Sequence, residues 1–361
     1  MKWIVRAAFG LEGIAAKELK KLGMQDVETL NTGGATFQGS LADALKANLW
    51  LRSADRVLLE MGKFKATTFD MLFERVRALP WRQILPKNAA FPVRAHCARS
   101  QLMSPSDCQK IVKKAVVEAM GGGWLAEDGA VFQIDVAIHA DVATISLDAS
   151  GESLSRRGYR TWNGEAPLRE SLAASLVMLT HKPGEMLYDP CCGTGTLLCE
   201  AAMIEQDRAP GLFRLFAMEK WSRMDPSVRE EAFARYEQGK NTPICMAGSD
   251  IDPQAVELAR RHLRQAKVQN VQIEERDLRT VRKTGSGLFL CNPPYGERLG
   301  DRKSAAAVER ALAEMYMAHP DWRLCVFTGD PSFEKNAKLH AQKRRRLYNG
   351  RLECELMYFG R

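Results

Sequence analysis

The sequence predicts a doubly wound α/β domain in the second half of the chain, preceded by smaller α+β units. Three observations lead to this prediction. After residue 168, short apolar strands alternate with helical segments, which is typical of a parallel sheet with crossover helices. Before residue 150, the strand and helix signals are shorter and mixed in order. Between these parts, residues 151–167 show no period and resemble a linker.

The elements expected in the first half follow from their apolar periods, two residues in strands and about 3.6 in helices. The helix at 104–120 begins with Ser-Pro-Ser-Asp and ends at three glycines, which are typical start and stop signals. In chain order we expect a strand at 3–8, helices at 11–22 and 42–54, a strand at 56–62, a helix at 69–79, a strand at 92–98, a helix at 104–120 and paired strands within 131–147.

The second half follows a stricter alternation, with no internal repeat and no low-complexity tract. Each strand is short and apolar, and each intervening helix is long enough to cross over a sheet. In chain order we expect a helix at 168–180, a strand at 186–188, a helix at 197–205, a strand at 244–248, a helix at 253–265, strands at 271–274 and 287–291, a helix at 305–318 and a strand at 323–328.

The composition is that of a globular protein with 361 residues, of which 45% are hydrophobic and 27% are charged. This length predicts two or three domains. No uncharged stretch approaches the roughly 18 to 20 residues that span a bilayer, so we expect a cytoplasmic protein. The nine cysteines are scattered and form no pairs with zinc spacing, so we expect reduced thiols and no metal site. The net charge of +8 favours a polyanionic partner.

Four segments follow predicted strands of the second half, at the positions where doubly wound sheets bind ligands. The first is Asp189-Pro190-Cys191-Cys192-Gly193-Thr194-Gly195-Thr196, whose small residues let the backbone approach a ligand. It is not a phosphate loop, because no Gly-Lys-Ser/Thr follows. The alternative is a tight turn between a strand and a helix, without a binding role.

The next two segments supply carboxylates. Asp250 ends a strand ahead of a helix, where a carboxylate can accept hydrogen bonds from both hydroxyls of a ribose. Asp252 lies at the helix N-cap position, where a capping role is more common than ligand binding. Asp277 follows the strand at 271–274 and can accept a hydrogen bond from an adenine amino group, although a solvated loop aspartate fits the spacing equally well.

The fourth segment, Asn292-Pro293-Pro294-Tyr295, follows the apolar strand at 287–291. Neither proline has a backbone N–H, so the turn presents carbonyl oxygens and the Asn292 amide oxygen as acceptors. Such acceptors suit a substrate that donates through an amino group, and Tyr295 can stack on an extruded base. The alternative is a structural Asn-Pro-Pro turn.

These segments resemble the class I S-adenosylmethionine-dependent methyltransferases, and 292–295 resembles the motif of those that methylate exocyclic amines. Pro167-Leu168-Arg169-Glu170 resembles an additional cofactor motif of the family. Cys191 stands where the wider family often has glycine. The resemblance implies S-adenosyl-L-methionine as cofactor, Asn292, Pro293, Pro294 and Tyr295 as catalytic residues, and cofactor contacts by Pro167, Leu168, Glu170, Asp189, Cys191, Gly193, Thr194, Gly195, Asp250, Ile251, Asp277, Leu278 and Asn292.

The first half resembles an RNA-binding module. Residues 98–102 and 107–115 are similar to the THUMP domain, which a ferredoxin-like segment precedes in such proteins. Lys110, Lys113 and Lys114 are spaced to share one helical face, which could meet phosphates. The alternative is a solvated helix face with no RNA contact.

Three further segments extend the resemblance to nearly the whole chain: 151–160, 292–299 and 347–354. Together they resemble the THUMP-type bacterial 23S ribosomal RNA guanine-N2-methyltransferases, those of the guanine-2445 type. The implied domains are a ferredoxin-like segment at 1–42, a THUMP domain at 43–155 and a Rossmann-like methyltransferase domain at 156–361. Further RNA contacts are expected at Arg156, Arg157, Arg160, Lys343, Arg344, Arg345 and Arg346, of which the last four could instead be a charged strand edge.

Several alternatives stay open. A transfer-RNA guanine-N2-methyltransferase would share both modules, so RNA is the expected partner, with ribosomal RNA favoured over transfer RNA. A ribosome-assembly factor could bind RNA through a fold that has lost catalysis, although intact Asp250, Asp277 and Asn292 argue against this. A DNA adenine methyltransferase leaves the THUMP-like half without a purpose. A nicotinamide dehydrogenase leaves Asn-Pro-Pro-Tyr unexplained.

Overall fold

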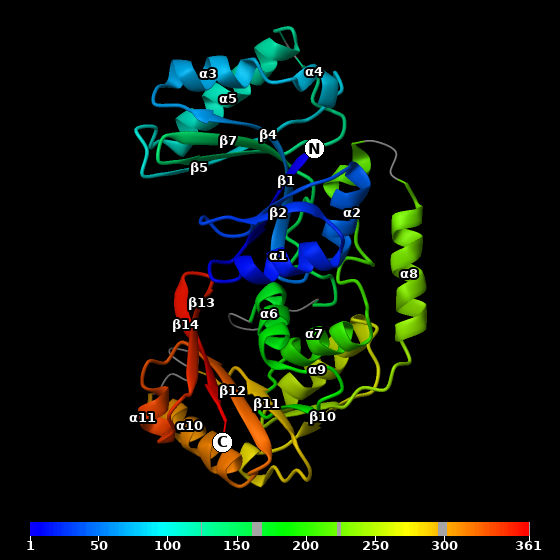
Figure 1. Cartoon of the computed structure of the whole chain (residues 1–361), viewed down its shortest axis with the longest axis vertical. Coiled ribbons are helices and arrows are strands. Elements are labelled where there is room, and N and C mark those ends of the chain that lie inside the picture. The colour runs from blue at the N-terminus through cyan, green and yellow to red at the C-terminus, as the bar shows by residue number, and fades with distance from the viewer. Residues whose placement is uncertain (124, 161–167, 222–224, 295–301, 361) are drawn as a thin grey trace.

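Two seven-stranded sheets lie one above the other along the long axis of the molecule (Figure 1). The structure is a computed structural model, and it describes residues 1–123, 125–160, 168–221, 225–294 and 302–360. The first sheet is built by the first half of the chain and the second sheet by the second half. Among the described residues, no helix is long and apolar enough to cross a bilayer.

The first sheet is continuous, with strand order β2-β3-β1-β4-β7-β6-β5. Its longest strand, β4, pairs with β1 through its first half and with β7 through its second half, so it joins the two regions expected at 1–42 and 43–155. The expected boundary at residue 42 falls inside helix α2. The strands are β1 (Lys2–Ala7), β2 (Gln25–Thr29), β3 (Ala35–Gln38), β4 (Ala54–Lys65), β5 (Val93–Ala98), β6 (Ile134–His139) and β7 (Val142–Asp148).

Helices α2 (Leu41–Trp50), α3 (Phe69–Arg77) and α5 (Pro105–Met120) begin at polar caps, namely Ser40, Thr68 and Ser104. The Ser104 side chain accepts a hydrogen bond from the backbone of Asp107, and Pro105 occupies the first turn of α5, as the sequence predicts. Helices α3 and α5 pack on each other and cover the part of the sheet formed by β4, β7, β6 and β5 (Figure 1). The helices are α1 (Glu12–Lys21), α2 (Leu41–Trp50), α3 (Phe69–Arg77), α4 (Trp81–Ile84) and α5 (Pro105–Met120).

The second sheet has the order β10-β9-β8-β11-β12-β14-β13. Its first five strands are parallel and follow the Rossmann order 3-2-1-4-5, whereas β14 pairs antiparallel with both β12 and β13. The topological switch point therefore lies between β8 and β11. The strands are β8 (Leu187–Asp189), β9 (Met246–Asp250), β10 (Val271–Glu275), β11 (Gly287–Cys291), β12 (Trp322–Thr328), β13 (Lys343–Asn349) and β14 (Leu352–Phe359).

Helices cover both faces of the second sheet, as the predicted doubly wound fold requires. Buried side chains of α6, α7 and α9 form one core with the sheet, and those of α10 and α11 form the other. The α-helices are α6 (Glu170–Thr180), α7 (Thr196–Glu205), α8 (Ser227–Gly239), α9 (Pro253–Gln265), α10 (Arg302–Met317) and α11 (Phe333–Ala337), and the 3-10 helices are η1 (Ala217–Lys220) and η2 (Leu278–Thr280).

The segment between α7 and β9, which contains η1 and α8, returns to the first half of the chain. Buried side chains of this segment, among them Phe216 and Met218, belong to the hydrophobic core of the first sheet. The guanidinium of Arg235, on α8, lies 4.1 Å from the ring centroid of Trp50, on α2. Figure 1 shows α8 running beside both halves. The two sheets are therefore joined by a shared core and not only by a linker.

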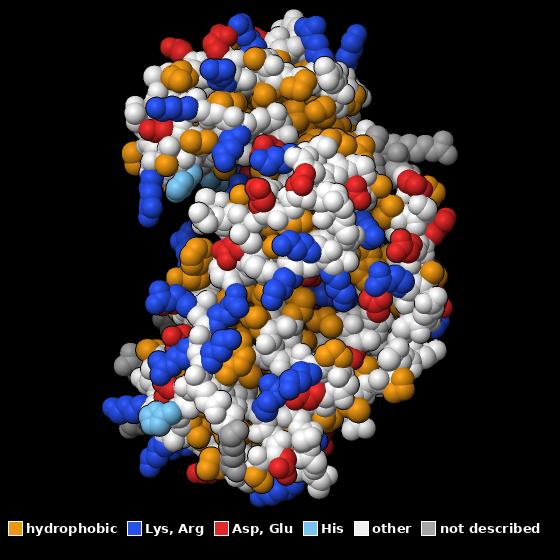
Figure 2. Space-filling model, viewed as in Figure 1, with side chains coloured by type: hydrophobic (Ala, Val, Ile, Leu, Met, Phe, Trp, Pro, Cys, Tyr) orange, Lys and Arg blue, Asp and Glu red, His pale blue; other side chains and the backbone are white. Residues whose placement is uncertain are grey.

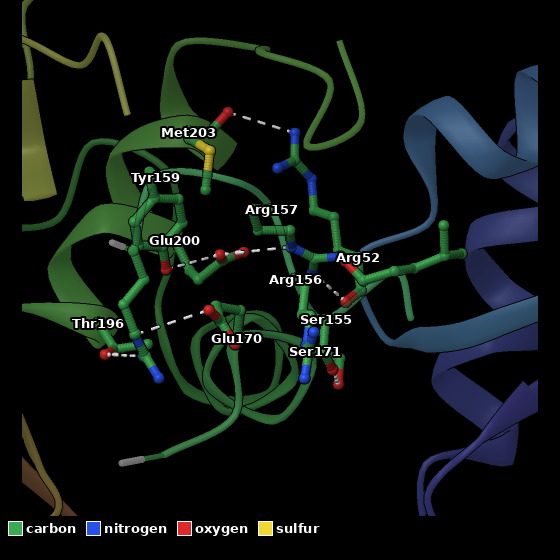
Figure 3. A network of polar contacts seen from close by, with 12 residues as sticks. Arg52, Ser155, Arg156, Arg157, Tyr159, Glu170, Ser171, Thr196, Glu200 and Met203 are labelled. Atoms are coloured by element: carbon green, nitrogen blue, oxygen red, sulfur yellow. Dashed lines mark hydrogen bonds and ion pairs between the residues drawn. The ribbon is translucent and has the colours of Figure 1, made fainter. Parts of the chain in front are cut away.

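A buried ionic network lies at the junction of the two halves (Figure 3). Its centre is Glu200, on α7, which has no exposed surface. The carboxylate of Glu200 accepts hydrogen bonds from Arg157 Nε (3.5 Å) and the Tyr159 hydroxyl (3.1 Å). Arg157 also donates to the Arg52 carbonyl oxygen (2.5 Å), which belongs to the first half. One buried carboxylate thus connects α7 with the segment that joins the two halves.

The network corrects two predictions from the sequence. Arg157 and Arg160 were expected to contact RNA, but both guanidinium groups lie in the interior. Arg160 forms an ion pair with Glu170 and donates to the Thr196 hydroxyl at 2.6 Å. Groups bound in this way do not reach the phosphates of a docked RNA. Their neighbour Arg156 is exposed and pairs with Glu152, as a surface residue does.

Replacing Arg157 by methionine should destabilise the protein by about 3 to 5 kcal/mol, because the Glu200 carboxylate would remain buried without its partner. The double variant Arg157→Met/Glu200→Leu should be closer to the wild type, since it removes both charges. Urea unfolding measures these differences. The control is Arg156→Ala, which changes an exposed side chain and should cost less than about 0.5 kcal/mol. An equal loss in Arg157→Met and in the control would contradict a structural role for the pair.

Candidate active site

The segments singled out in the sequence meet at one edge of the second sheet. β8 ends at Asp189, β9 at Asp250 and β11 at Cys291, and all three strands are parallel and adjacent in the order β9-β8-β11. Their carboxyl ends therefore open on the same side, on either side of the switch point. This is the position at which open α/β sheets bind ligands.

The glycine-rich turn after β8 is fixed by hydrogen bonds to two carboxylates. Asp189 is buried and accepts a hydrogen bond from the Cys191 backbone N–H (3.1 Å). Asp250, at the end of the neighbouring strand, accepts one from the Gly193 N–H (2.8 Å). The carbonyl oxygen of Thr194 lies 3.0 Å from His262 Nδ1, on α9. The turn is thus held before any ligand binds.

Gly195 is required by its backbone conformation and by its neighbours. Its φ is +79°, a value that L side chains rarely adopt, and a Cβ at this position would lie 3.0 Å from the Cβ of Ala259, on α9. The left-handed residue lets α7 start immediately at Thr196. The close contact places the N-terminus of α7 against α9, which sets the floor of the turn.

A pocket opens beside this turn, and it includes five residues that the sequence assigns to the cofactor: Cys191, Asp250, Ile251, Asp277 and Leu278. Pro294 lies on its rim from the Asn-Pro-Pro segment. The sequence assigned no cofactor contact to the other lining residues, which are Pro190, Arg276, Arg279, Ala307, Val308 and Ala311. Ala307, Val308 and Ala311 share one face of α10. Their spacing is that of any helix face, so the sequence alone does not show that this face lines a ligand pocket.

The two carboxylates in this pocket, Asp250 and Asp277, have different hydrogen-bond partners. Asp250 uses one oxygen for Gly193 and the other for the Asp252 backbone N–H (3.1 Å). Asp277 caps η2 through the Arg279 backbone N–H (2.9 Å) and also binds the Arg279 guanidinium, whose Nε lies 3.0 Å from each oxygen. The Arg279 side chain lowers the pKa of Asp277 below its ordinary value through these hydrogen bonds. Both carboxylates line the pocket.

Asn292 supplies an acceptor that nothing else in the described part of the chain uses. Its Oδ1 is buried and has no hydrogen-bond partner among the described residues. Pro293 is buried beside it, and Pro294 lines the pocket. A buried amide oxygen without a donor costs free energy, so its position calls for a ligand that donates. Tyr295 and Pro167, both expected at the site, lie outside the described residues.

Two residues of the additional cofactor motif lie at the start of α6. Leu168 is buried, and its carbonyl oxygen accepts a hydrogen bond from Arg160 Nη2 (3.1 Å). Glu170 is also buried and faces the Arg160 guanidinium, with 3.6 Å between Nε and Oε1. Burial nevertheless raises the pKa of Glu170 above its ordinary value. Glu170 therefore acts through Arg160, which also binds Thr196 at the start of α7.

The basic residues expected to contact RNA differ in their exposure. Lys110 is largely exposed, Lys113 forms an ion pair with Glu127 at 2.5 Å, and Lys114 is exposed with its Nζ 5.6 Å from the Phe73 ring centroid. On β13, at the edge of the second sheet, Lys343, Arg344 and Arg346 are exposed. Arg344 pairs with Glu334 and Arg346 with Glu353, while Arg345 Nη2 donates to the Gly10 carbonyl oxygen at 2.5 Å.

A family model described as the RMKL-like methyltransferase domain matches residues 157–357. The chain belongs to the RMKL-like methyltransferase family. Models for the RlmL ferredoxin-like domain and the THUMP domain match residues 2–58 and 66–148. The predicted fold class is thereby confirmed, as a class I methyltransferase domain preceded by ferredoxin-like and THUMP domains.

Two curated relatives resemble this methyltransferase over nearly its whole length. A Bacillus subtilis (strain 168) protein, provisionally named RNA methyltransferase YpsC, is 36% identical over 98% of this chain and 94% of its own. The Ribosomal RNA large subunit methyltransferase K/L of Syntrophotalea carbinolica is also 36% identical, over 99% of this chain. The chain spans only 53% of that K/L protein.

Two solved structures share the fold of this methyltransferase. A Listeria monocytogenes protein named as an N6-adenine-specific DNA methylase superposes with a TM-score of 0.92 at 39% identity and covers 100% of this chain and 96% of its own. SMU.472, provisionally named a methyltransferase, superposes with a TM-score of 0.91 at 35% identity over 99% of this chain and 97% of its own, and its structure contains S-adenosylhomocysteine. The cofactor of this family is S-adenosyl-L-methionine, as the motifs predict. Among the described residues, no group of side chains could hold a metal ion.

Replacing Asp189 by asparagine should make stability less dependent on pH. Burial, with a smaller contribution from Asp250, raises the pKa of Asp189 well above its ordinary value of 3.8. Because the folded pKa exceeds the unfolded one, the wild type loses stability as the pH rises from about 4 through the folded pKa. Asparagine keeps the acceptor for the Cys191 N–H and has no proton to lose.

The stability gain of the Asp189→Asn variant over the wild type should therefore grow with pH. Thermal unfolding of both proteins without cofactor, between pH 5 and 8, measures this difference. A difference that stays constant over this range would show that the folded protein does not raise the pKa of Asp189 into or above this range.

Proposed function

We propose that this protein transfers a methyl group from S-adenosylmethionine to the exocyclic N2 of a guanosine in large-subunit ribosomal RNA, of the guanine-2445 type. The observation that carries the proposal is the buried Asn292 Oδ1, which has no hydrogen-bond partner in the described part of the chain and lies beside a pocket lined by Asp250 and Asp277. The names of the K/L relatives and the match of the RlmL ferredoxin-like model support the choice of substrate. The reaction would take place in the cytoplasm.

The pocket residues fit the adenosine part of the cofactor. Asp250 can accept hydrogen bonds from ribose hydroxyls, and Asp277 can accept one from the adenine amino group while it stays paired with Arg279. The apolar side chains of Ile251, Leu278 and Val308 offer surfaces for the adenine ring. The glycine-rich turn, which Asp189 and Asp250 hold in place, would face the methionine part.

The chemistry requires alignment more than proton abstraction by a strong base. The cofactor supplies an activated sulfonium methyl group when bound. Asn292 Oδ1 and the Pro293 carbonyl oxygen would accept hydrogen bonds from the two N–H groups of the amine, which turns the nitrogen lone pair out of conjugation with the ring. The same acceptors would stabilise the positive charge that develops on the nitrogen. The prolines fix the backbone so that the acceptors are aligned before the substrate arrives.

The acceptor also favours one position on the guanine. N2 carries two hydrogens and can donate to Asn292, whereas N7 is an acceptor and would face the amide oxygen without a proton between them. Because the K/L name covers two activities, this distinction matters. The unpaired Oδ1 therefore favours methylation of N2 over methylation of N7.

Replacing Asn292 by alanine should lower kcat by about 100-fold or more, since it removes an acceptor used in the transition state. The affinity for S-adenosylhomocysteine, measured by calorimetry, should change little. The control is Asn292→Asp, which keeps an acceptor oxygen at the same position and should retain more activity than alanine. If Asn292→Ala turned over like the wild type, the assigned role would be wrong.

The substrate is tested by adding the purified protein and cofactor to RNA from a strain that lacks it. Mass spectrometry of the nucleosides should show new N2-methylguanosine in 23S ribosomal RNA. New N2-methylguanosine in transfer RNA would show that the substrate is transfer RNA and not ribosomal RNA. New 7-methylguanosine would show that the target atom is N7 and not N2. Methylated adenine in DNA would favour the activity named for the Listeria protein. No product on any of these, despite cofactor binding, would favour an RNA-binding assembly factor.

A further inference from the structure

A second pocket lies where the β13–β14 hairpin meets the N-terminal region. Its lining includes Phe9, Asp55, Arg169, Tyr348 and Gly350, which come from both halves of the chain. Figure 1 shows the tip of the hairpin against the start of α1. None of these residues belongs to the cofactor pocket described above, and the mechanism proposed for Asn292 does not use them.

Phe9 is an exposed aromatic side chain on a firmly held turn. Its exposed fraction is 59%, and its ring meets that of Tyr348 edge to face, with 6.0 Å between centroids. The next residue, Gly10, donates its N–H to Glu12 and accepts a hydrogen bond from Arg345, on β13. The turn is thus tied on both sides, and the Phe9 ring is held at the surface, where it contributes little to the core.

The pocket lies beyond the same edge of the second sheet as Asn292, the edge at which β8, β9 and β11 end. In the strand register, Cys291 is opposite Val326, and Val326 is opposite Met357. The hairpin turn precedes Leu352, five residues before Met357, and at about 3.3 Å per residue it rises roughly 17 Å beyond the level at which the chain leaves β11. A strand of RNA that delivers a base to Asn292 would pass along this edge.

The polar surroundings match a nucleotide. Arg169 is exposed at the pocket, and the hairpin adds the exposed cations Lys343, Arg346 and Arg351. Figure 2 shows Lys and Arg side chains gathered over this part of the molecule. The Asp55 carboxylate lies in the lining and accepts hydrogen bonds through Oδ1 from the hydroxyls of Ser155 (2.8 Å) and Ser171 (3.0 Å). These bonds hold the carboxylate in place through one of its two oxygens.

We propose that this pocket binds one unpaired nucleobase of the RNA substrate, stacked on Phe9, with Arg169 near its phosphate and Asp55 accepting a base N–H. Aromatic rings beside cationic side chains are the usual platform for single-stranded nucleic acid. The proposal rests on the proposed function, because it assumes an RNA substrate. It adds a contact that positions the strand outside the catalytic pocket.

The test is binding of the full-length protein to unmodified 23S ribosomal RNA transcribed in vitro, measured by filter binding. Phe9→Ala should weaken binding about 10-fold, and Phe9→Trp should bind like the wild type, because stacking needs a ring and not a particular one. The control is Phe233→Ala on α8. Phe233 is 48% exposed and also contacts a tyrosine, Tyr236, but lies outside the pocket. This control should bind normally.

The salt dependence separates stacking from charge. Phe9→Ala should leave the slope of log affinity against log salt unchanged, while Arg346→Gln should reduce its magnitude by about one unit or less. Binding of Phe9→Ala within twofold of the wild type, or an equal loss in Phe233→Ala, would overturn the pocket while leaving the methyltransferase function in place. If the wild type itself bound no RNA, the proposed function would fall together with the pocket.

Discussion

The arrangement of the site depends on the buried carboxylate of Glu200. A charge with no exposed surface must be compensated nearby, and here Arg157 and Tyr159 compensate it. Both belong to the segment that leaves the first half of the chain, while Glu200 belongs to α7, which starts directly after the glycine-rich turn. Because the Glu200 carboxylate must be neutralised, the segment with Arg157 and Tyr159, which leads into the methyltransferase domain, is held in a fixed position relative to the glycine-rich turn.

Arg160 extends this constraint to the site itself. Its guanidinium binds the Thr196 hydroxyl, the Leu168 carbonyl oxygen and the Glu170 carboxylate, so the starts of α6 and α7 are held together. On the other side, Arg157 binds the Arg52 carbonyl oxygen of the first half. Buried side chains between α7 and β9 add a hydrophobic connection to the first half, beside these polar ones.

The elements with a strong period were predictable, and those shaped by distant packing were not. The expected helix 253–265 and strand 287–291 match α9 and β11 in both bounds, because capping residues and a continuous apolar run define them locally. No element was expected between residues 206 and 243, because the apolar side chains of that segment face the other half of the chain. No hairpin was expected at the end of the chain either, since charges dominate its first strand, but the charged strand edge given as the alternative for residues 343–346 matches β13. Arg157 and Arg160 were misassigned because sequence shows charge but not burial.

The contrast between local patterns and distant packing also explains which features of the site the motifs predict. Motif residues Asp189, Asp250 and Asn292 come from strands whose neighbours in the sheet are dictated by topology, so their meeting at one edge followed from the alternation of strands and helices. What no motif reveals is that Asn292 Oδ1 has no donor among the described residues, while the carboxylates of Asp189 and Asp250 both accept hydrogen bonds from the glycine-rich turn. A buried acceptor without a donor costs free energy, and beside a pocket lined by Asp250 and Asp277 a donating ligand would recover that cost. If the target nitrogen is that donor, it must carry hydrogen, and the choice of RNA would be left to surfaces far from Asn292.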